Sequence, residues 1–292
     1  MNTCLRALLP LLFLPVASAA QVRGAVSASR TNGVAPLAVF FDATATRDAD
    51  PSVNAFHDLD YEWDFGDPVG VWPVSGSPRG QALGPVAGHV FEPASFPDDC
   101  GGGPQTCKRF SVGLVIRDRA GAHGVRPVDI EVEDPQHRFA TSTVCVSRTS
   151  DATGCPSGAS QKLNQTGTFE SILAAVIDSG GSRRVLFHAG QEWSHTATYR
   201  INAAGPGLIG SFDSEGVCSA ANPCTQKAVA SFTAASGTGI YFNDDDWRLS
   251  DLELRGIGSG TPMAVGFMHT KDQQGVDYNI RNTVLRLDLQ GF

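Results

Sequence analysis

Two acidic stretches in the C-terminal half of the chain contain residue types that bind cations or sugars. The first, NDDDW, places Asp244, Asp245 and Asp246 side by side between two apolar segments. Carboxylate oxygens are the hard ligands that Ca²⁺ prefers, so this run is a candidate calcium site, and calcium is the only cofactor that the sequence suggests. A run of Asp between strands is also typical of a solvated turn, and both interpretations stay open.

The second stretch, SDLELRG, alternates charged and apolar residues. If Leu252 and Leu254 face a core, Asp251 and Glu253 lie on the outward face of the same strand, with Arg255 beside them. An outward carboxylate pair with a nearby guanidinium predicts part of a binding groove. An ordinary solvated strand face is the alternative.

Recognisable catalytic patterns are missing elsewhere in the sequence. His188, His195 and His269 have no carboxylate partner or ligand-spaced neighbour along the chain, and there is no G-x-S-x-G or H-E-x-x-H motif. The catalytic residues of any enzyme built on this chain are therefore unknown from the sequence.

The N-terminus and the overall charge indicate an exported protein. Residues 1–20 combine one Arg near the start, a short apolar run and closing small residues, which predicts a secretory signal peptide. No stretch is long enough to predict a transmembrane helix. The net charge is −8, and no basic cluster exceeds Arg183-Arg184, which argues against a nucleic-acid partner. We expect a secreted protein, extracellular or at the cell surface.

Cysteine usage agrees with export. Six cysteines follow the predicted signal peptide, in neighbouring pairs that predict three local disulfides: Cys100 with Cys107, Cys145 with Cys155, and Cys218 with Cys224. Metal binding is the alternative, but no C-x-x-C pair exists. A disulfide that closes a short loop stabilises the folded state less than one that closes a long loop, so we expect these bridges to hold local loops in place.

Residues 21–135 show the period-two pattern of β-strands. In APLAVFFDATAT the apolar residues Leu37, Val39 and Phe41 alternate, and in YEWDFGD the aromatic residues Tyr61 and Trp63 do so. KRFSVGLVIRDRAG and VRPVDIEVED continue the pattern. Short alternating strands between turn residues predict a β-sandwich.

These strands resemble the PKD domain, an immunoglobulin-like repeat, through APLAVFFDAT, YEWDFGD, HVF and FSVGLVIRDRAG. The resemblance implies that Trp63 packs between two sheets and that the module is a spacer or binding module. Asp64 and Asp67 are expected to cap a tight turn, with Ca²⁺ binding as the alternative. Pro68 and the insertion at residues 68–88 depart from the family pattern.

Residues 165–292 contain one amphipathic helix followed by strands. TFESILAAVID has a single apolar stripe at helical spacing, beginning at Phe169. In WRLSDLEL the alternation changes parity at Ser250-Asp251, so the chain must bend there to keep all four apolar side chains inward. The similar tripeptides YRI at 199, WRL at 247 and YNI at 278 suggest repeating coils. We expect AVASFTA near 228 to supply one further coil between YRI and WRL.

This segment resembles right-handed parallel β-helix proteins of the pectate-lyase type, in which an N-terminal helix caps the first coil. RRVLFHAGQEW and GLIGSF resemble early coils. We therefore predict an all-β protein: an immunoglobulin-like β-sandwich, a disulfide-containing linker at residues 136–164, and a right-handed parallel β-helix with an N-terminal capping helix. LDLQGF ends the chain in a strand pattern, so we expect either a longer natural protein, which we favour, or a covering partner.

The expected function follows from this architecture by analogy with the fold. We expect a carbohydrate-associated protein that binds extracellular polysaccharide or a cell-surface component along the β-helix, with the first module as spacer or binding module. The alternatives are a polysaccharide lyase or glycosidase with catalytic residues partly outside this chain, and a structural or adhesive cell-surface protein.

Overall fold

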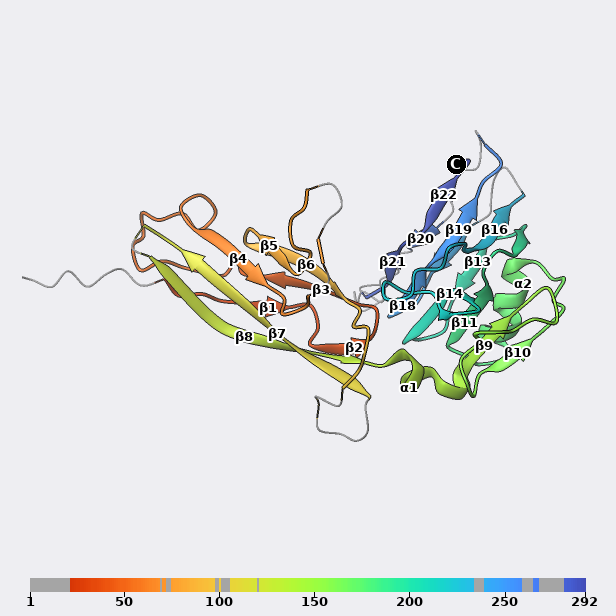
Figure 1. The fold of residues 1–292 in the computed structure, drawn as a ribbon. Coiled ribbons are helices and arrows are strands. Elements are labelled where there is room, and N and C mark those ends of the chain that lie inside the picture. Colours follow the sequence, from red (N-terminus) through yellow and green to blue (C-terminus); the bar gives the residue numbers. More distant parts are fainter. Residues whose placement is uncertain are drawn as a thin grey trace, which may run out of the picture.

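The computed structural model describes residues 22–68, 70–71, 75–97, 100, 106–119, 121–233, 239–258, 265–267 and 281–292. The predicted signal peptide, residues 1–20, lies outside this part. The fold is mainly β, as predicted, with antiparallel sheets in the N-terminal module and stacked parallel sheets in the C-terminal module (Figure 1). Among the described residues, no helix is long and apolar enough to cross a membrane.

The N-terminal module consists of two facing sheets. The three-stranded sheet has the order β1 (Ser27–Ala28), β3 (Leu37–Asp42), β6 (Val86–Phe91). The five-stranded sheet has the order β2 (Asn32–Val34), β8 (Ala122–Glu133), β7 (Cys107–Arg117), β4 (Asp60–Asp64), β5 (Gln81–Leu83), with β2 parallel to β8 and the other pairs antiparallel. Strand β5 lies in the segment that the sequence marks as an insertion, and it extends the sheet beside β4.

The aromatic residues of YEWDFGD form the centre of this module. Tyr61, Trp63 and Phe65 are buried, and the rings of Trp63 on β4 and Phe41 on β3 lie 5.7 Å apart across the two sheets. The Trp63 indole N–H donates to the Gly84 carbonyl at 2.7 Å, which satisfies its buried polar atom. The expected position of Trp63 between two sheets is confirmed.

The two acids of this stretch have different roles. Asp64 Oδ1 accepts the Gly66 N–H at 2.9 Å, and Gly66 has a φ of 64°, so Asp64 closes the turn as expected. Asp67 is buried and its Oδ2 lies 2.9 Å from Nε2 of His89 on β6. The prediction that Asp67 also caps this turn is wrong, because its carboxylate pairs with a side chain of the opposite sheet.

Two short helical turns connect the modules: α1 (Pro135–Phe139) and η1 (Ala140–Ser142). Asp134 caps α1 by accepting the Gln136 N–H at 2.7 Å. Parallel pairing then starts at once, with β9 (Thr143–Val146) between β10 (Ser160–Lys162) and the next strand of the module. Residues 136–164, expected to be a linker, therefore contribute two strands. All four residues of β9 are buried, so its sequence lacks the alternation of apolar and polar residues from which a strand is predicted.

Three parallel sheets make up the C-terminal module (Figure 1). The first has the order β10, β9, β11 (Arg184–His188), β14 (Gly207–Asp213), β18 (Trp247–Ser250), β21 (Thr283–Leu285), with β15 (Gly216–Val217) antiparallel to β14. The second is β12 (Glu192–His195), β16 (Ala228–Phe232), β19 (Leu252–Arg255), β22 (Asp288–Gln290). The third is β13 (Tyr199–Ile201), β17 (Ile240–Phe242), β20 (Val265–Phe267).

The predicted bend in WRLSDLEL is confirmed. Strand β18 belongs to the first sheet and β19 to the second, and Asp251 between them has a φ of 57°. Trp247, Leu249, Leu252 and Leu254 are all fully buried in one core. A flat strand would have turned the last two outward, so the bend lets both halves face the core.

The predicted repeat is wrong in its assignments. YRI at Tyr199 forms β13 and pairs with β17, whereas WRL at Trp247 forms β18 and pairs with Gly207 on β14. AVASF forms β16, in the remaining sheet. The three segments occupy three different sheets, so their similarity reflects a shared inward-facing pattern. YNI at 278 lies outside the described residues.

The predicted helix is present as α2 (Phe169–Leu173) and continues as the π-helical turn η2 (Ala174–Asp178). Thr168 caps it, with its hydroxyl oxygen accepting the Ser171 N–H at 3.3 Å. The apolar stripe packs onto the core of the parallel sheets, where Phe169 stacks on Phe187 with ring centroids 4.4 Å apart. The helix thus covers the core beside the first strands (Figure 1).

A buried acid–base pair joins this helix to β12. Nδ1 of fully buried His195 lies 3.3 Å from Oε2 of Glu170. Burial lowers the pKa of His195 below its ordinary value of 6.5, and the attraction of Glu170 offsets only part of this effect. Burial raises the pKa of Glu170, but its hydrogen bonds, chiefly with Thr196, outweigh burial and hold the pKa below 4.5.

Acidification below pH 6.5 is therefore expected to destabilise the protein through His195. A histidine with a depressed folded pKa binds fewer protons in the folded state than in the unfolded state, so stability is lost as pH falls from 6.5 toward the folded value. The loss is at most about 1.4 kcal/mol per pH unit. The pKa of Glu170 is lower in the folded state than in the unfolded state, so protonation of Glu170 lowers stability further as pH falls below 4.5.

Urea titrations between pH 7 and pH 5 would measure this effect as the difference between the wild type and His195→Leu. The variant should have the flatter pH profile. The exposed His57→Leu serves as the matched control and should keep the wild-type slope. Equal slopes for the wild type and His195→Leu would contradict the prediction.

Buried arginine contacts join the two modules. Arg248 is fully buried and donates to the main-chain carbonyls of Pro36 at 3.1 Å and Val34 at 3.0 Å. Its guanidinium also lies 2.9 Å from the Asp246 carboxylate, which Arg30 of the N-terminal module contacts at 2.8 Å. These bonds cross the boundary between the antiparallel and parallel sheets, so the N-terminal module is fixed against the C-terminal module.

Apolar packing reinforces this boundary. Val34 belongs to a small cluster of buried residues whose other members come from the connecting segment and the parallel sheets: Phe139, Cys145, Leu186, Leu208 and Phe212. Arg286 adds a further ionic link by contacting the Glu92 carboxylate with two nitrogens. The modules therefore share a continuous interface of apolar and charged contacts.

Candidate functional site

A groove of about 730 Å³ runs over the outward face of the sheet β12-β16-β19-β22. Its volume lies within the range of ligand-binding clefts. The residues that line it come from these strands, from the loop before β16 and from the bends on either side of β19 and β22: Gly190, Glu192, Pro223, Cys224, Thr225, Gln226, Lys227, Val229, Asp251, Glu253, Arg255, Arg286 and Asp288.

Strand register places three of the four acids of this groove in one row. Glu192 pairs with Val229, Val229 with Glu253, and Glu253 with Asp288. The neighbouring row, which includes Leu254, faces the core, so the acidic row faces outward. Adjacent strands are about 4.8 Å apart, so these side chains project at regular steps along the groove.

Arg255 connects two acids of this row. Its guanidinium donates to Glu253 Oε1 through Nε at 3.0 Å and reaches Glu192 Oε2 through Nη1 at 2.9 Å. The hydrogen bond with Glu253 raises the pKa of Arg255. The side chain is 39% exposed, so the guanidinium keeps access to solvent and to a ligand.

The other end of the groove holds two further cations. Lys227 Nζ lies 2.9 Å from Asp288 Oδ1 and donates to the Arg286 carbonyl at 2.7 Å. Arg286 Nε donates to Asp251 Oδ1 at 2.7 Å, and the same guanidinium contacts Glu92. Burial opposes the charge of Arg286, but its bonds with these two carboxylates outweigh burial and raise its pKa. The N-terminal module thus supplies Glu92 to the edge of the groove.

All three predicted binding residues, Asp251, Glu253 and Arg255, line the groove. Their arrangement differs from the expected strand face in one respect. Asp251 lies at the bend, outside β19, and is only 3% exposed, with its carboxylate turned to Arg286. Sequence reasoning did not find Glu192, Lys227, Arg286 and Asp288. Only the period-two position of Glu192 beside buried Trp193 could have signalled an outward residue.

The predicted calcium ligands do not gather around one point. Asp246 contacts Arg30 and Arg248, and Asp245 contacts Arg281 at 2.6 Å. Asp244 Oδ1 accepts the Asp245 N–H at 2.8 Å. Within the described ranges, these three carboxylates form no group with metal-ligand spacing. Asp246 thus forms an ion pair across the module boundary, Asp245 forms one within the C-terminal module, and Asp244 closes a local turn, so this geometry gives calcium binding no support.

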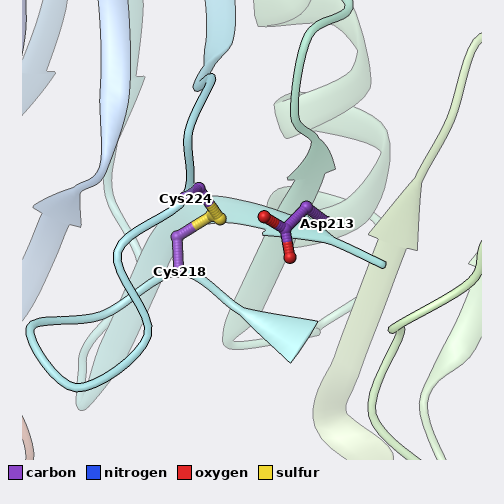
Figure 2. A group of neighbouring side chains, drawn as sticks. All are labelled: Asp213, Cys218 and Cys224. Carbon is purple, nitrogen blue, oxygen red and sulfur yellow. A yellow bond between two sulfur atoms is a disulfide. The ribbon is translucent and has the colours of Figure 1, made fainter. Parts of the chain in front are cut away.

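The three predicted disulfides are confirmed: Cys100–Cys107, Cys145–Cys155 and Cys218–Cys224. They indicate an oxidising environment. Across the described part of the chain, the one group with metal-ligand spacing is Asp213, Cys218 and Cys224, and Figure 2 shows that its two sulfurs are joined in the last of these disulfides. A metal-binding cysteine must be a free thiolate, so this group does not bind a metal. Asp213 accepts the Glu215 N–H at 2.9 Å.

No protein-family model matches this chain, and no curated protein matches it. The chemistry of the groove must therefore be argued from its own residues. Four carboxylates and three cations line it, and each of these charged groups contacts an opposite charge. Such a surface offers hydrogen-bond donors and acceptors side by side, and its charge is close to balanced. It suits a ligand with many hydroxyl groups, each of which both donates and accepts.

Proposed function

We propose that the protein binds extracellular polysaccharide in the groove over β12-β16-β19-β22. The observation that carries this proposal is the in-register row Glu192, Val229, Glu253 and Asp288, in which three carboxylates stand on strands of one sheet along an open cleft. A polymer of repeating sugar units matches such a row. The resemblance of the C-terminal module to right-handed parallel β-helix proteins, with α2 as the N-terminal cap, supports the same proposal by analogy of fold.

The charge of the groove favours a neutral polysaccharide over a polyuronate. Four carboxylates outnumber three cations, so a chain of negatively charged sugars meets net repulsion. Neutral sugars instead exchange hydrogen bonds with Arg255, Glu253 and Lys227 at little electrostatic cost. We therefore extend the proposal to a neutral polysaccharide as the preferred ligand class.

The N-terminal module, which resembles a PKD domain, acts in this proposal as a fixed part of the binding unit. Its Glu92 reaches the groove through Arg286, and Arg248 holds the module in place. A flexible spacer would make no such buried contacts. The module therefore supports the wall of the groove in addition to extending the protein.

Replacing Arg255 with alanine is expected to weaken binding of neutral polysaccharide at least about tenfold, because the charge-assisted bonds of the guanidinium to sugar hydroxyls are lost. Affinity electrophoresis and calorimetry against xylan, galactomannan and β-glucan, with pectate and alginate as acidic polymers, would measure this. Arg109→Ala is the matched control, because Arg109 forms an exposed ion pair with Glu131 on the N-terminal module.

The proposal fails if no polymer binds, or if Arg255→Ala and Arg109→Ala bind equally well. Tighter binding of pectate than of neutral polymers would overturn the choice of ligand class. Release of reducing or unsaturated ends during the same incubations would show that the groove belongs to a glycosidase or lyase. Concentration-dependent self-association without polysaccharide binding would favour a structural or adhesive protein.

A further inference from the structure

An exposed apolar strip lies on the outward face of the three-stranded sheet of the N-terminal module. Phe40 on β3 is 66% exposed, and Val86 and Val90 on β6 are 53% and 37% exposed. Strand register pairs Phe40 with Gly88, midway between the two valines. These four residues form the β3–β6 strip, and alternation places all of them on the face opposite the buried core.

The sheet holds Phe40 in a fixed position. The Phe40 N–H donates to Ser29 Oγ at 3.0 Å, and the Phe40 carbonyl accepts the Ser29 N–H at 2.8 Å. One edge of the ring lies against Gly88, where an added β-carbon would come 3.2 Å from Cε1. The aromatic ring is therefore presented to solvent from a rigid strand, so a ligand that contacts it orders little of the protein.

The β3–β6 strip leads to the groove of the C-terminal module. Glu92 directly follows β6, and the alternation that exposes Val90 places Glu92 on the same outward face. Its Oε1 accepts Nη2 of Arg286 at 2.9 Å, and Arg286 lines the groove. Four residues of extended chain separate Glu92 from Gly88, a distance of about 14 Å. The strip and the groove therefore meet at the Glu92–Arg286 ion pair.

The two surfaces offer complementary contacts to a sugar chain. The described lining of the groove contains no aromatic side chain, so its contacts with a sugar are mainly hydrogen bonds. Such bonds replace bonds with water and each adds little net affinity. A sugar ring also has an apolar face of C–H groups, and an aromatic side chain removes that face from water when the two stack. Phe40 supplies the aromatic surface that the groove lacks.

We propose that a neutral polysaccharide chain bound in the groove continues over the β3–β6 strip and stacks on Phe40. This inference rests on the proposed function of the groove. Acids stand at both ends of the strip, Glu92 beside the groove and Asp42 opposite Val86, so a polymer with negative charges is disfavoured here as well. The N-terminal module thus provides a second binding surface for the same chain.

Chain length separates this surface from the groove. Calorimetric titration of the full chain uses xylan, galactomannan and β-glucan, each compared with a trisaccharide of the same sugar, which the groove holds alone. Phe40→Ala should lower the ratio of polymer affinity to trisaccharide affinity at least about fivefold. Arg255→Ala should weaken the binding of both. Phe56→Ala, at an exposed ring in a loop of the same module, is the matched control and should keep the wild-type ratio.

Two further variants test whether the ring itself is needed. Phe40→Tyr keeps an aromatic face and should restore polymer binding, whereas Phe40→Leu keeps an apolar side chain and should bind as weakly as Phe40→Ala. If Arg255→Ala weakens polymer binding and Phe40→Ala does not, this inference is overturned and the groove proposal stands. Equal weakening of trisaccharide and polymer by Phe40→Ala would also overturn it. If no polymer binds the wild type, both proposals fail.

Discussion

Replacing Arg248 with methionine is expected to lower the free energy of unfolding by about 3–5 kcal/mol, the usual cost of removing one partner from a buried ionic contact. The side chain is fully buried and bonds to Pro36, Val34 and Asp246. Methionine fills part of the volume but donates no hydrogen bond. The two carbonyls then lose their donor in a site that water cannot reach, and each unsatisfied buried group is costly.

Urea unfolding followed by tryptophan fluorescence would measure this loss, because both modules contain buried tryptophans at Trp63 and Trp247. We also expect the transition to broaden or split as the modules lose their shared contacts. Arg109→Met, at an exposed ion pair of the N-terminal module, is the matched control and should change stability by less than about 0.5 kcal/mol. A loss below about 1 kcal/mol for Arg248→Met, with a single sharp transition, would contradict the prediction.

Replacing Trp247 with alanine is expected to lower the free energy of unfolding by about 3–5 kcal/mol, because a large buried side chain leaves a cavity that the core cannot close. The indole is fully buried, and its N–H donates to the Ala203 carbonyl at 2.6 Å. Its ring lies directly over β14, where a β-carbon on Gly207 would come 2.4 Å from Cε3. A residue larger than glycine at position 207 would therefore clash with the indole, so Gly207 on β14 and Trp247 on β18 fit only as a pair.

Circular dichroism during thermal unfolding and a urea titration would measure the effect of Trp247→Ala. The matched control is Phe56→Ala, which removes an aromatic side chain that is 61% exposed and should change stability by less than about 0.5 kcal/mol. If Trp247→Ala lowered the free energy of unfolding no more than Phe56→Ala, the indole would not be the central packing element of the parallel sheets.

The strands of the N-terminal module could be predicted because their signal is local. Leu37, Val39 and Phe41 alternate with more exposed residues, and alternation of side chains across a strand needs only neighbouring residues. The same local rule located the bend at Asp251, since a change of parity in an apolar pattern forces a change of direction. The disulfides were predictable for a similar reason, because each joins cysteines close in sequence.

The coils of the C-terminal module were harder to align. Arg184 pairs with Leu208, Leu208 with Arg248, and Arg248 with Thr283, so successive coils differ in length. Without a fixed period, similar tripeptides such as YRI and WRL could be assigned to one sheet although they lie in two. Loops of variable length carry no register information, and only the pairing of strands in space supplies it.

The sequence by itself therefore determined the mainly β character, the helix at residues 169–178, the disulfides and three residues of the groove. Only the tertiary structure decided which charges meet. Asp246 lies 216 residues from Arg30 along the chain, and Glu192 reaches Arg255 only after two coils have returned to the same sheet. Hydrophobic periodicity follows from local backbone geometry, whereas ion pairs and cavities depend on distances between segments that no local pattern encodes.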